Sequence, residues 1–160
     1  MKLLSTISLI LALCISAYAY KPPLKQVEVN GVKLYVLADD IEEGLEDGMI
    51  DQFWLAEAIK ENKVPKGIHF IDLRDAKKYK VSHIKGAINA PYNRDKESMD
   101  KSKLPKDGII VFYCDTGIKS TEARTTFEDE KEASRIFVFD TAYRCDKEYK
   151  NCLIKPNGSQ

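Results

Sequence analysis

Three short apolar runs mark the interior of the chain. They lie at 67–73, 109–113 and 135–139 and consist mostly of Ile, Val, Leu and Phe. Runs of this length that are apolar on both faces are typical of strands buried in a parallel sheet. The segment 120–129, between the last two runs, predicts a helix. The order strand, helix, strand predicts an α/β fold with parallel strands joined by right-handed crossovers.

The chain before these runs has a different pattern. Apolar and polar residues alternate at 27–29 and 32–36, on either side of Asn30-Gly31, and this predicts a two-stranded hairpin. Residues 39–48 are acidic and contain two glycines, so we expect an exposed connection there. The apolar spacing over 50–61 predicts an amphipathic helix.

The first nineteen residues resemble a secretory signal peptide in their order of charge and hydropathy. Lys2 is their only charge, the stretch 3–15 is apolar apart from Ser and Thr, and small residues stand at Ala17 and Ala19 before a cleavage point. The apolar run is shorter than the roughly 18 to 20 residues that span a bilayer. We therefore expect a signal peptide at 1–19, a secreted or periplasmic protein, and no membrane span after cleavage.

Composition excludes several classes of function. The 160 residues suffice for one domain, and Lys+Arg and Asp+Glu balance at 25 each. No basic stripe indicates nucleic acid as a partner, and no glycine-rich phosphate loop or dinucleotide fingerprint is present. Cys145 and Cys152 are seven residues apart with no second pair, which is a poor pattern for zinc. We expect neither a metal nor another cofactor.

Three cysteines, Cys114, Cys145 and Cys152, remain once the leader is removed. In an oxidising compartment an odd number of cysteines leaves one thiol unpaired after any disulfide has formed.

Cys114 directly follows the apolar run 109–113 and precedes a short loop and a predicted helix. Inward-turned backbone N–H groups and the helix N-terminus would stabilise a thiolate or persulfide there. Gly117 would let this loop close tightly. The alternative is a small buried residue at a strand end, which is the commoner fate of a lone cysteine.

Two motifs resemble the rhodanese family. The first extends from 71–75 through Tyr79 to 83–91, and the second is the loop 114–120, which has the form Cys-x-x-Gly-x-[Arg/Lys]-Ser. The resemblance covers about 50–140. The loop consists of Cys114, Asp115, Thr116, Gly117, Ile118, Lys119 and Ser120. Lys119 is expected to meet an anionic donor, and Ser120 to cap the following helix.

The resemblance implies an α/β, rhodanese-like domain over 49–155, in which helices flank a central parallel sheet. An N-terminal extension at 20–48 contains the hairpin. Cys114 would accept sulfane sulfur from a small donor, such as thiosulfate, polysulfide or a persulfide, and pass it to a nucleophile that can be a protein. The motif's structural residues would be Asp72, Arg74, His83 and Gly86. We interpret His83 as a hydrogen-bonded structural histidine, not as a base.

The chain departs from the family pattern at two places. Asp115 puts a carboxylate beside the nucleophile, which should discourage dianionic thiosulfate. The family's Gly-Gly…Trp element after the last strand is missing from 140–145. We expect a Cys145–Cys152 disulfide to fix this segment instead. The alternatives are two free structural cysteines, or Cys145 acting as the resolving partner of Cys114.

Three functions are compatible with these residues. The leading hypothesis is an exported sulfurtransferase that works through a persulfide on Cys114. The alternatives are a sulfur-carrier or partner-binding module without general thiosulfate activity, and a thiol-disulfide redox protein. Phosphatases and arsenate reductases of related fold need an arginine six residues after the cysteine to bind the oxyanion. This chain has Ser120 at that position, so the sequence argues against phosphate-ester chemistry.

Overall fold

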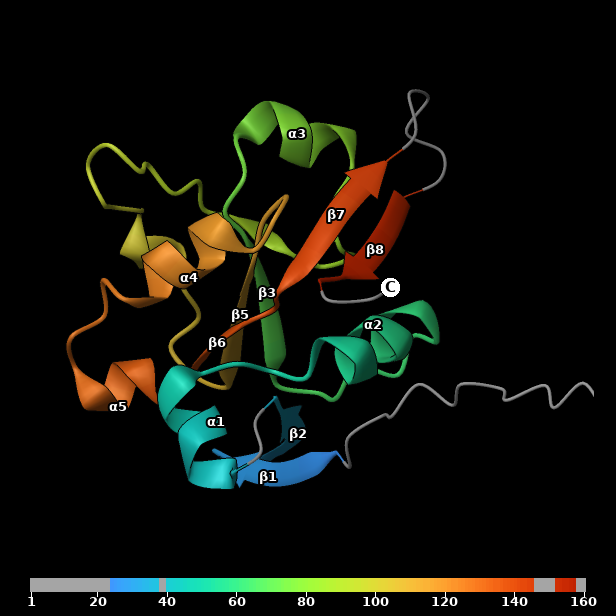
Figure 1. Ribbon diagram of the computed structural model, residues 1–160. Coiled ribbons are helices and arrows are strands. Elements are labelled where there is room, and N and C mark those ends of the chain that lie inside the picture. The colour runs from blue at the N-terminus through green and yellow to red at the C-terminus, as the bar shows by residue number, and fades with distance from the viewer. Residues whose placement is uncertain (1–23, 38–39, 146–151, 158–160) are drawn as a thin grey trace, which may run out of the picture.

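The computed structural model describes residues 24–37, 40–145 and 152–157, and the side chains of residues 144, 145, 152 and 153 lie outside this description. Four parallel strands form the central sheet in the order β4-β3-β5-β6 (Figure 1). They are β3 (Ile68–Asp72), β4 (Ile88–Asn89), β5 (Ile109–Tyr113) and β6 (Ile136–Val138). The three apolar runs form β3, β5 and β6, which confirms the parallel α/β sheet.

Helices cover both faces of this sheet. Leu55 of α2 and Ala123 of α4 belong to different hydrophobic clusters, and the two helices lie on opposite sides of the sheet in Figure 1. The helices that surround the sheet are α2 (Gln52–Lys60), α3 (Ala76–Val81), α4 (Ile118–Arg124) and α5 (Glu130–Ala133), with a 3₁₀ turn at Lys101–Lys103.

The helix predicted over 120–129 is wrong in its bounds. Gly117 forms the N-terminal boundary of α4, so Ser120 lies inside the helix and does not cap it. The carboxylate of Asp129 accepts a hydrogen bond from Glu132 N at 2.8 Å and starts the separate helix α5. An aspartate in this capping position favours a new helix start over the continuation of an existing helix.

A short helix, α1 (Ile41–Asp47), replaces the predicted connection over 39–48. Asp40 caps its N-terminus by accepting a hydrogen bond from Glu42 N at 2.7 Å. Gly48 ends it in the left-handed conformation, with φ of 60°. The acidic residues and the glycine that predicted a loop are therefore the capping signals of a helix.

The N-terminal hairpin is confirmed. Strands β1 (Lys25–Val29) and β2 (Val32–Val36) pair antiparallel around the predicted turn at Asn30 and Gly31, which both have positive φ. Residues 48–50 join this hairpin to the central sheet. Val138 N donates to Gly48 O at 2.7 Å, and residue 50 forms an antiparallel bridge to the end of β2.

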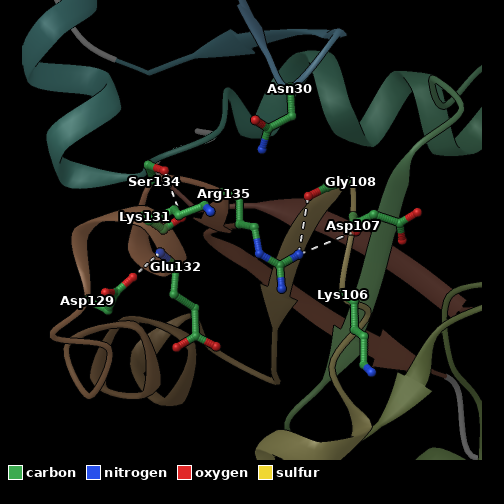
Figure 2. A pocket seen from close by; sticks show the side chains of 9 residues that line it. All are labelled: Asn30, Lys106, Asp107, Gly108, Asp129, Lys131, Glu132, Ser134 and Arg135. Carbon is green, nitrogen blue, oxygen red and sulfur yellow. Dashed lines mark hydrogen bonds between the residues drawn. The ribbon is translucent and has the colours of Figure 1, made fainter.

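The amino end of the central sheet carries a shallow depression of about 490 Å³ (Figure 2). Arg135 stands in it and donates hydrogen bonds to the backbone carbonyls of Pro105, Asp107 and Gly108. The guanidinium thereby ties the loop before β5 to the start of β6. The depression is lined by Asn30, Lys106, Asp107, Gly108, Asp129, Lys131, Glu132, Ser134 and Arg135. These contacts indicate that Arg135 has a structural role.

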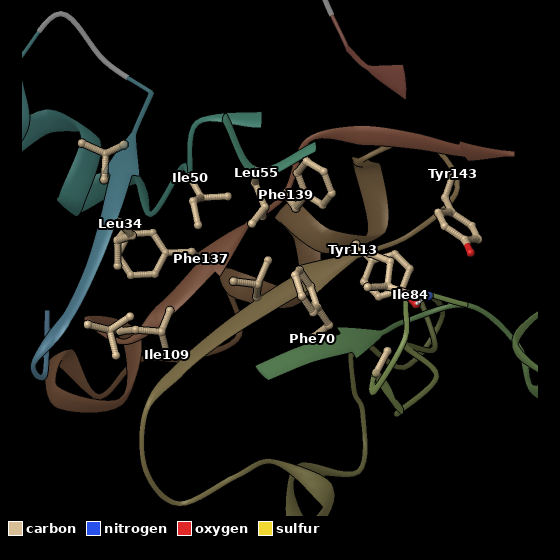
Figure 3. Packing of buried hydrophobic residues seen from close by; sticks show 14 of the residues in the cluster. Leu34, Ile50, Leu55, Phe70, Ile84, Ile109, Tyr113, Phe137, Phe139 and Tyr143 are labelled. Carbon is tan, nitrogen blue, oxygen red and sulfur yellow. Dashed lines mark hydrogen bonds between the residues drawn. The ribbon is translucent and has the colours of Figure 1, made fainter. Parts of the chain in front are cut away.

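Successive residues of β5 alternate between two hydrophobic clusters. Ile109, Val111 and Tyr113 pack with the hairpin, α2 and Phe137 (Figure 3). Ile110, Phe112 and Cys114 pack on the other face, in the cluster that contains Ala123 of α4. Alternation of this kind is the geometry of a strand buried on both sides. It also decides that Cys114 lies on the α4 side of the sheet.

A second hairpin follows the central sheet. It consists of β7 (Thr141–Cys145) and β8 (Cys152–Pro156), with Cys145 in register with Cys152. Pro156 stands opposite Thr141 and has no N–H, and Asn157 N donates to Asp140 O at 3.2 Å. Because paired positions alternate in an antiparallel ladder, Cys145 and Cys152 occupy a non-hydrogen-bonded pair, where Cα atoms are about 4.5 Å apart. Disulfides span Cα separations of about 4.4 to 6.8 Å.

No helix in the described part of the chain is long and apolar enough to cross a membrane. The predicted signal peptide at 1–19 lies outside the described residues. Export and location therefore stay predictions from the sequence.

Candidate active site

Cys114 is the first residue after β5, at the carboxyl end of the parallel sheet. It is a free thiol and only 2% exposed. Leu73 N donates to Tyr113 O at 3.0 Å, so the ends of β3 and β5 are held together beside it. This edge is where open α/β sheets place their ligands.

The loop after Cys114 closes at Gly117. This residue has φ of 86°, and a Cβ built on it would lie 2.1 Å from Asp140 Oδ1. Both observations require glycine here, as the sequence analysis expected for a tightly closed loop. The carbonyl of Gly117 accepts hydrogen bonds from Ser120 N and Thr121 N, each at 3.1 Å, which begin α4.

The remaining loop side chains differ in their exposure. Thr116 is exposed, Lys119 is half-buried, and Ile118 is 55% exposed although it is apolar. Ser120 is fully buried, and its hydroxyl has no hydrogen-bond partner among the described residues. Buried hydroxyls nearly always have a partner, so this one is available to a group bound at the loop.

Asp115 forms an ion pair that the sequence analysis did not foresee. Lys78 Nζ on α3 donates to Asp115 Oδ2 at 2.5 Å, and Arg74 Nη1 lies 3.7 Å from Asp115 Oδ1. The hydrogen bond to Asp115 raises the pKa of Lys78 above its ordinary value. The Asp115 carboxylate is therefore paired with Lys78, and Arg74, which also pairs with Asp72, lies near it. The only sequence signal for this contact is that both motifs lie at the carboxyl edge of one sheet.

Asp72 and Arg74 form a buried pair beneath the loop. Arg74 Nε lies 2.9 Å from Asp72 Oδ1, and Nη2 lies 2.6 Å from Oδ2. Burial lowers the pKa of Arg74, but the hydrogen bonds and charge of Asp72 outweigh it and leave that pKa above its ordinary value. Burial and the Asp72 charge raise the pKa of Tyr113, so its hydroxyl stays protonated and donates to Asp72 Oδ2 at 2.9 Å.

The Arg74 guanidinium also lies under two aromatic rings, 4.5 Å from the ring centre of Tyr143 and 5.7 Å from that of Tyr113. The Tyr143 hydroxyl is 2.8 Å from Ser82 Oγ. The Arg74 guanidinium is thus contacted by residues of β3, β5 and β7 and of the end of α3. This contact fixes the C-terminal hairpin against the site, next to the end of β5.

The other motif residues hold the chain that surrounds the site. His83 Nδ1 lies 2.8 Å from the Tyr79 carbonyl, and the two rings stack with centres 4.0 Å apart. Gly86 has φ of 81° in the turn before β4. Asn89, which the sequence analysis missed, donates to the carbonyls of Asp72 and Arg74 at 3.0 and 2.9 Å. These contacts hold neighbouring backbone segments together, and the structural role of His83 stays a prediction.

A second residue that the sequence analysis missed is Asn157, which follows β8. Its Nδ2 donates to the carbonyl of Thr116 at 3.1 Å and to Asp140 Oδ1 at 2.6 Å. It therefore connects the active-site loop to the end of β6. Asp140 and Asn157 are ordinary polar residues 17 positions apart, and no local pattern could have indicated their contact with the loop.

No group of three or more metal-ligating side chains occurs among the described residues.

Comparison with known proteins matches residues 51–151 to the family model for the rhodanese-like domain. The chain belongs to the rhodanese family. The match contains both motifs and so confirms the resemblance inferred from them. The fold of this rhodanese, a central parallel sheet with flanking helices and a preceding hairpin, is the predicted one.

Individual relatives match parts of this rhodanese. Thiosulfate sulfurtransferase PspE of Escherichia coli strain K12 is 34% identical over 56 residues, which are 35% of this chain and 54% of PspE. The tRNA uridine(34) hydroxylase of Escherichia coli O81 strain ED1a is 27% identical over 127 residues, covering 66% of this chain and 36% of that protein. The crystal structure of the BH2092 protein from Bacillus halodurans is 28% identical, with a TM-score of 0.42, over 58% of this chain and 66% of that one.

This rhodanese spans about half the length of PspE and about a third of the hydroxylase. The family and the similarity to PspE support a function of the sulfurtransferase type.

Proposed function

We propose that this rhodanese is an exported sulfurtransferase in which Cys114 carries sulfane sulfur as a persulfide. The observation that supports this best is the position of Cys114, a buried free thiol that opens the Cys-x-x-Gly-x-Lys-Ser loop at the carboxyl end of β5. Export rests on the leader-like segment at 1–19.

The reaction needs two displacements at sulfur and no external oxidant. The Cys114 thiolate attacks the outer sulfur of the donor, a new S–S bond forms, and the donor's S–S bond breaks. With thiosulfate the bonding pair leaves on sulfite. An acceptor nucleophile, such as a thiolate or cyanide, then attacks the outer sulfur of the persulfide. Cys114 leaves as a thiolate and is ready for another cycle.

The charges around the loop suit an anionic donor better than the sequence indicates. Lys78 and Arg74 compensate Asp115, so a dianion does not meet an isolated carboxylate. The buried hydroxyl of Ser120 can donate a hydrogen bond to the negatively charged persulfide. The pairing of Asp115 with Lys78 therefore removes one objection to thiosulfate as the donor.

The test is intact-mass spectrometry after incubation with thiosulfate or polysulfide. The parent chain should gain the mass of one sulfur, mapped to Cys114, and should transfer it to cyanide. Cys114→Ser should fold and transfer no sulfur, because a hydroxyl cannot form a persulfide. A matched control, Cys145→Ser with Cys152→Ser, should keep the activity. Transfer by Cys114→Ser at the parent rate would disprove the proposal.

One observation favours a delivery role for the same persulfide. Ile118 is apolar and 55% exposed within the active-site loop, and an exposed apolar side chain next to a buried nucleophile suits contact with a protein acceptor. Ile118→Ser should then slow transfer to a protein thiol while leaving transfer to cyanide unchanged. Equal effects on both acceptors would argue against a protein acceptor at this residue.

A further inference from the structure

We propose that Asn157 is a positioning residue, which fixes the orientation of the peptide group between Thr116 and Gly117 in the active-site loop. The proposal rests on the proposed role of Cys114 as a nucleophile. It extends that role, because it assigns a function in the reaction to the residue that follows the C-terminal hairpin and is distant in sequence from both rhodanese motifs.

Asn157 is itself held from several directions. Its N–H donates to the Asp140 carbonyl at 3.2 Å, and its carbonyl accepts a hydrogen bond from Gln52 Nε2 at 3.1 Å. Its side-chain amide donates to Asp140 Oδ1 and to the Thr116 carbonyl. The amide that reaches the loop is therefore anchored to both β6 and α2. An anchored donor can restrain the loop, whereas a flexible surface amide could not.

The peptide group that Asn157 contacts is one that turns easily. Thr116 is exposed, and Gly117 has no Cβ that would clash when its φ changes sign, so the peptide between them can rotate at a lower steric cost than one followed by any other residue. In a planar trans peptide the C=O and the next N–H point in opposite directions. Rotation would exchange the side that offers a hydrogen-bond donor for the side that offers an acceptor.

The hydrogen bond to Asn157 selects one of these orientations. The Thr116 carbonyl points to Asn157, at the end of the β8 hairpin that contacts α2. Cys114 packs in the cluster on the opposite, α4 side of the sheet, and the two sides are separated in Figure 1. Because the Thr116 carbonyl is held toward Asn157, the Gly117 N–H points to the other side of the peptide, away from Asn157, and the proposal places it on the side that faces Cys114. An N–H there stabilises a thiolate or persulfide, whereas a carbonyl would repel it.

Asn157 also moderates a negative charge. Asp140 Oδ1 lies close against Gly117, and no lysine or arginine is paired with it among the described side chains. The Asn157 amide, 2.6 Å from that oxygen, donates a hydrogen bond to it. Both contacts of one amide group thus favour an anionic sulfur in the loop.

The experiment measures alkylation of Cys114 by iodoacetamide as a function of pH in the full chain, with the site mapped by mass spectrometry. Asn157→Leu removes both hydrogen bonds. The exchange Asp140→Asn with Asn157→Asp keeps a hydrogen bond between the two positions but removes the donor to Thr116. Lys155→Ala, a change at an exposed residue of the preceding strand β8, is the matched control.

Asn157→Leu and the exchange variant should both slow alkylation at pH 7 by about three- to tenfold, because less thiolate is present. Their rates should rejoin the parent rate at high pH, and Lys155→Ala should follow the parent throughout. An exchange variant with the parent profile would overturn the proposal, as would an equal slowing at every pH, which indicates changed access. If Asn157→Leu does not fold, the exchange variant decides alone. A parent chain that takes up no sulfur would refute the proposed function, while the alkylation profiles would still report on Asn157.

Discussion

Removing the positive charge of Lys78 should weaken the reaction with thiosulfate selectively. In Lys78→Met the aliphatic stem is retained, but Asp115 loses the ammonium group that lies 2.5 Å away. Arg74, at 3.7 Å, remains as its only partner among the described residues. The net charge near the loop falls by one, so a dianionic donor is disfavoured more than a monoanionic one.

The size of the expected loss with thiosulfate can be calculated from Coulomb's law. The dielectric constant of water applies, because the side chains of Lys78 and Asp115 are 53% and 38% exposed. At a dielectric constant of about 80 and a separation of about 6 Å, one unit charge changes the energy of a dianion by about 1.4 kcal/mol. Screening at physiological ionic strength reduces this to about 0.7 kcal/mol. The expected loss in kcat/KM is therefore about three- to tenfold, larger at low salt.

The assay compares kcat/KM for thiosulfate and for a singly charged thiosulfonate at two ionic strengths. Asp115→Asn should raise the thiosulfate rate by a similar factor, and Lys78→Met with Asp115→Asn should return it to about the parent value. Lys77→Met, on an exposed neighbour, is the control. Equal losses with both donors, or a double variant as slow as Lys78→Met, would refute the electrostatic reasoning.

The pH dependence of this pair has a definite sign. Since Asp115 raises the pKa of Lys78 above its ordinary 10.5, the ammonium group is fully charged below that value. Its contribution to stability and to donor binding is lost only as pH rises through the elevated pKa. Changes in rate between pH 6 and 9 therefore belong to other groups.

Two further predictions concern the loop and the C-terminal hairpin. Gly117→Ala should destabilise the chain by about 1 to 3 kcal/mol in chemical denaturation, because positive φ and the close approach of Asp140 both oppose a Cβ; unchanged stability would show that the loop relaxes freely. Non-reducing peptide mapping of the protein produced in an oxidising compartment should show a Cys145–Cys152 link, and its reduction should cost about 2 to 3 kcal/mol of stability. A Cys114–Cys145 link would instead indicate a thiol-disulfide function.

The parts of the fold that the sequence predicted are those with a local pattern. Strands β3, β5 and β6 are buried on both faces and so are continuous apolar runs. The first hairpin has Asn30-Gly31, whose positive φ values select its turn. The predicted loop over 39–48 failed, because Asp40 and Gly48 are capping residues whose composition is also that of a loop.

The residues of the candidate site also fall into two groups, those that a local motif predicts and those that only the fold brings together. Cys114 and Gly117 could be found from the motif, since each must occupy its own position in the loop. The contacts of Lys78 and Asn157 with the loop join residues 37 and 41 positions apart, and neither contact repeats or leaves a periodic signal. Such side chains can be recognised only once the topology has placed α3 and β8 beside the loop.

The segment 48–50 covers the outer edge of β6, the last strand of the central sheet. An edge strand with free N–H and C=O groups is a template for pairing with another chain. Here Val138 N donates to Gly48 O, and Val138 O accepts from Ile50 N, so the outer side of β6 is occupied. A fragment limited to the matched region 51–151 would open this margin and strip Leu34 and Val36 from the core. The residues upstream of the rhodanese match thus cover an edge strand that would otherwise be free to pair with another chain, and they supply part of the hydrophobic core.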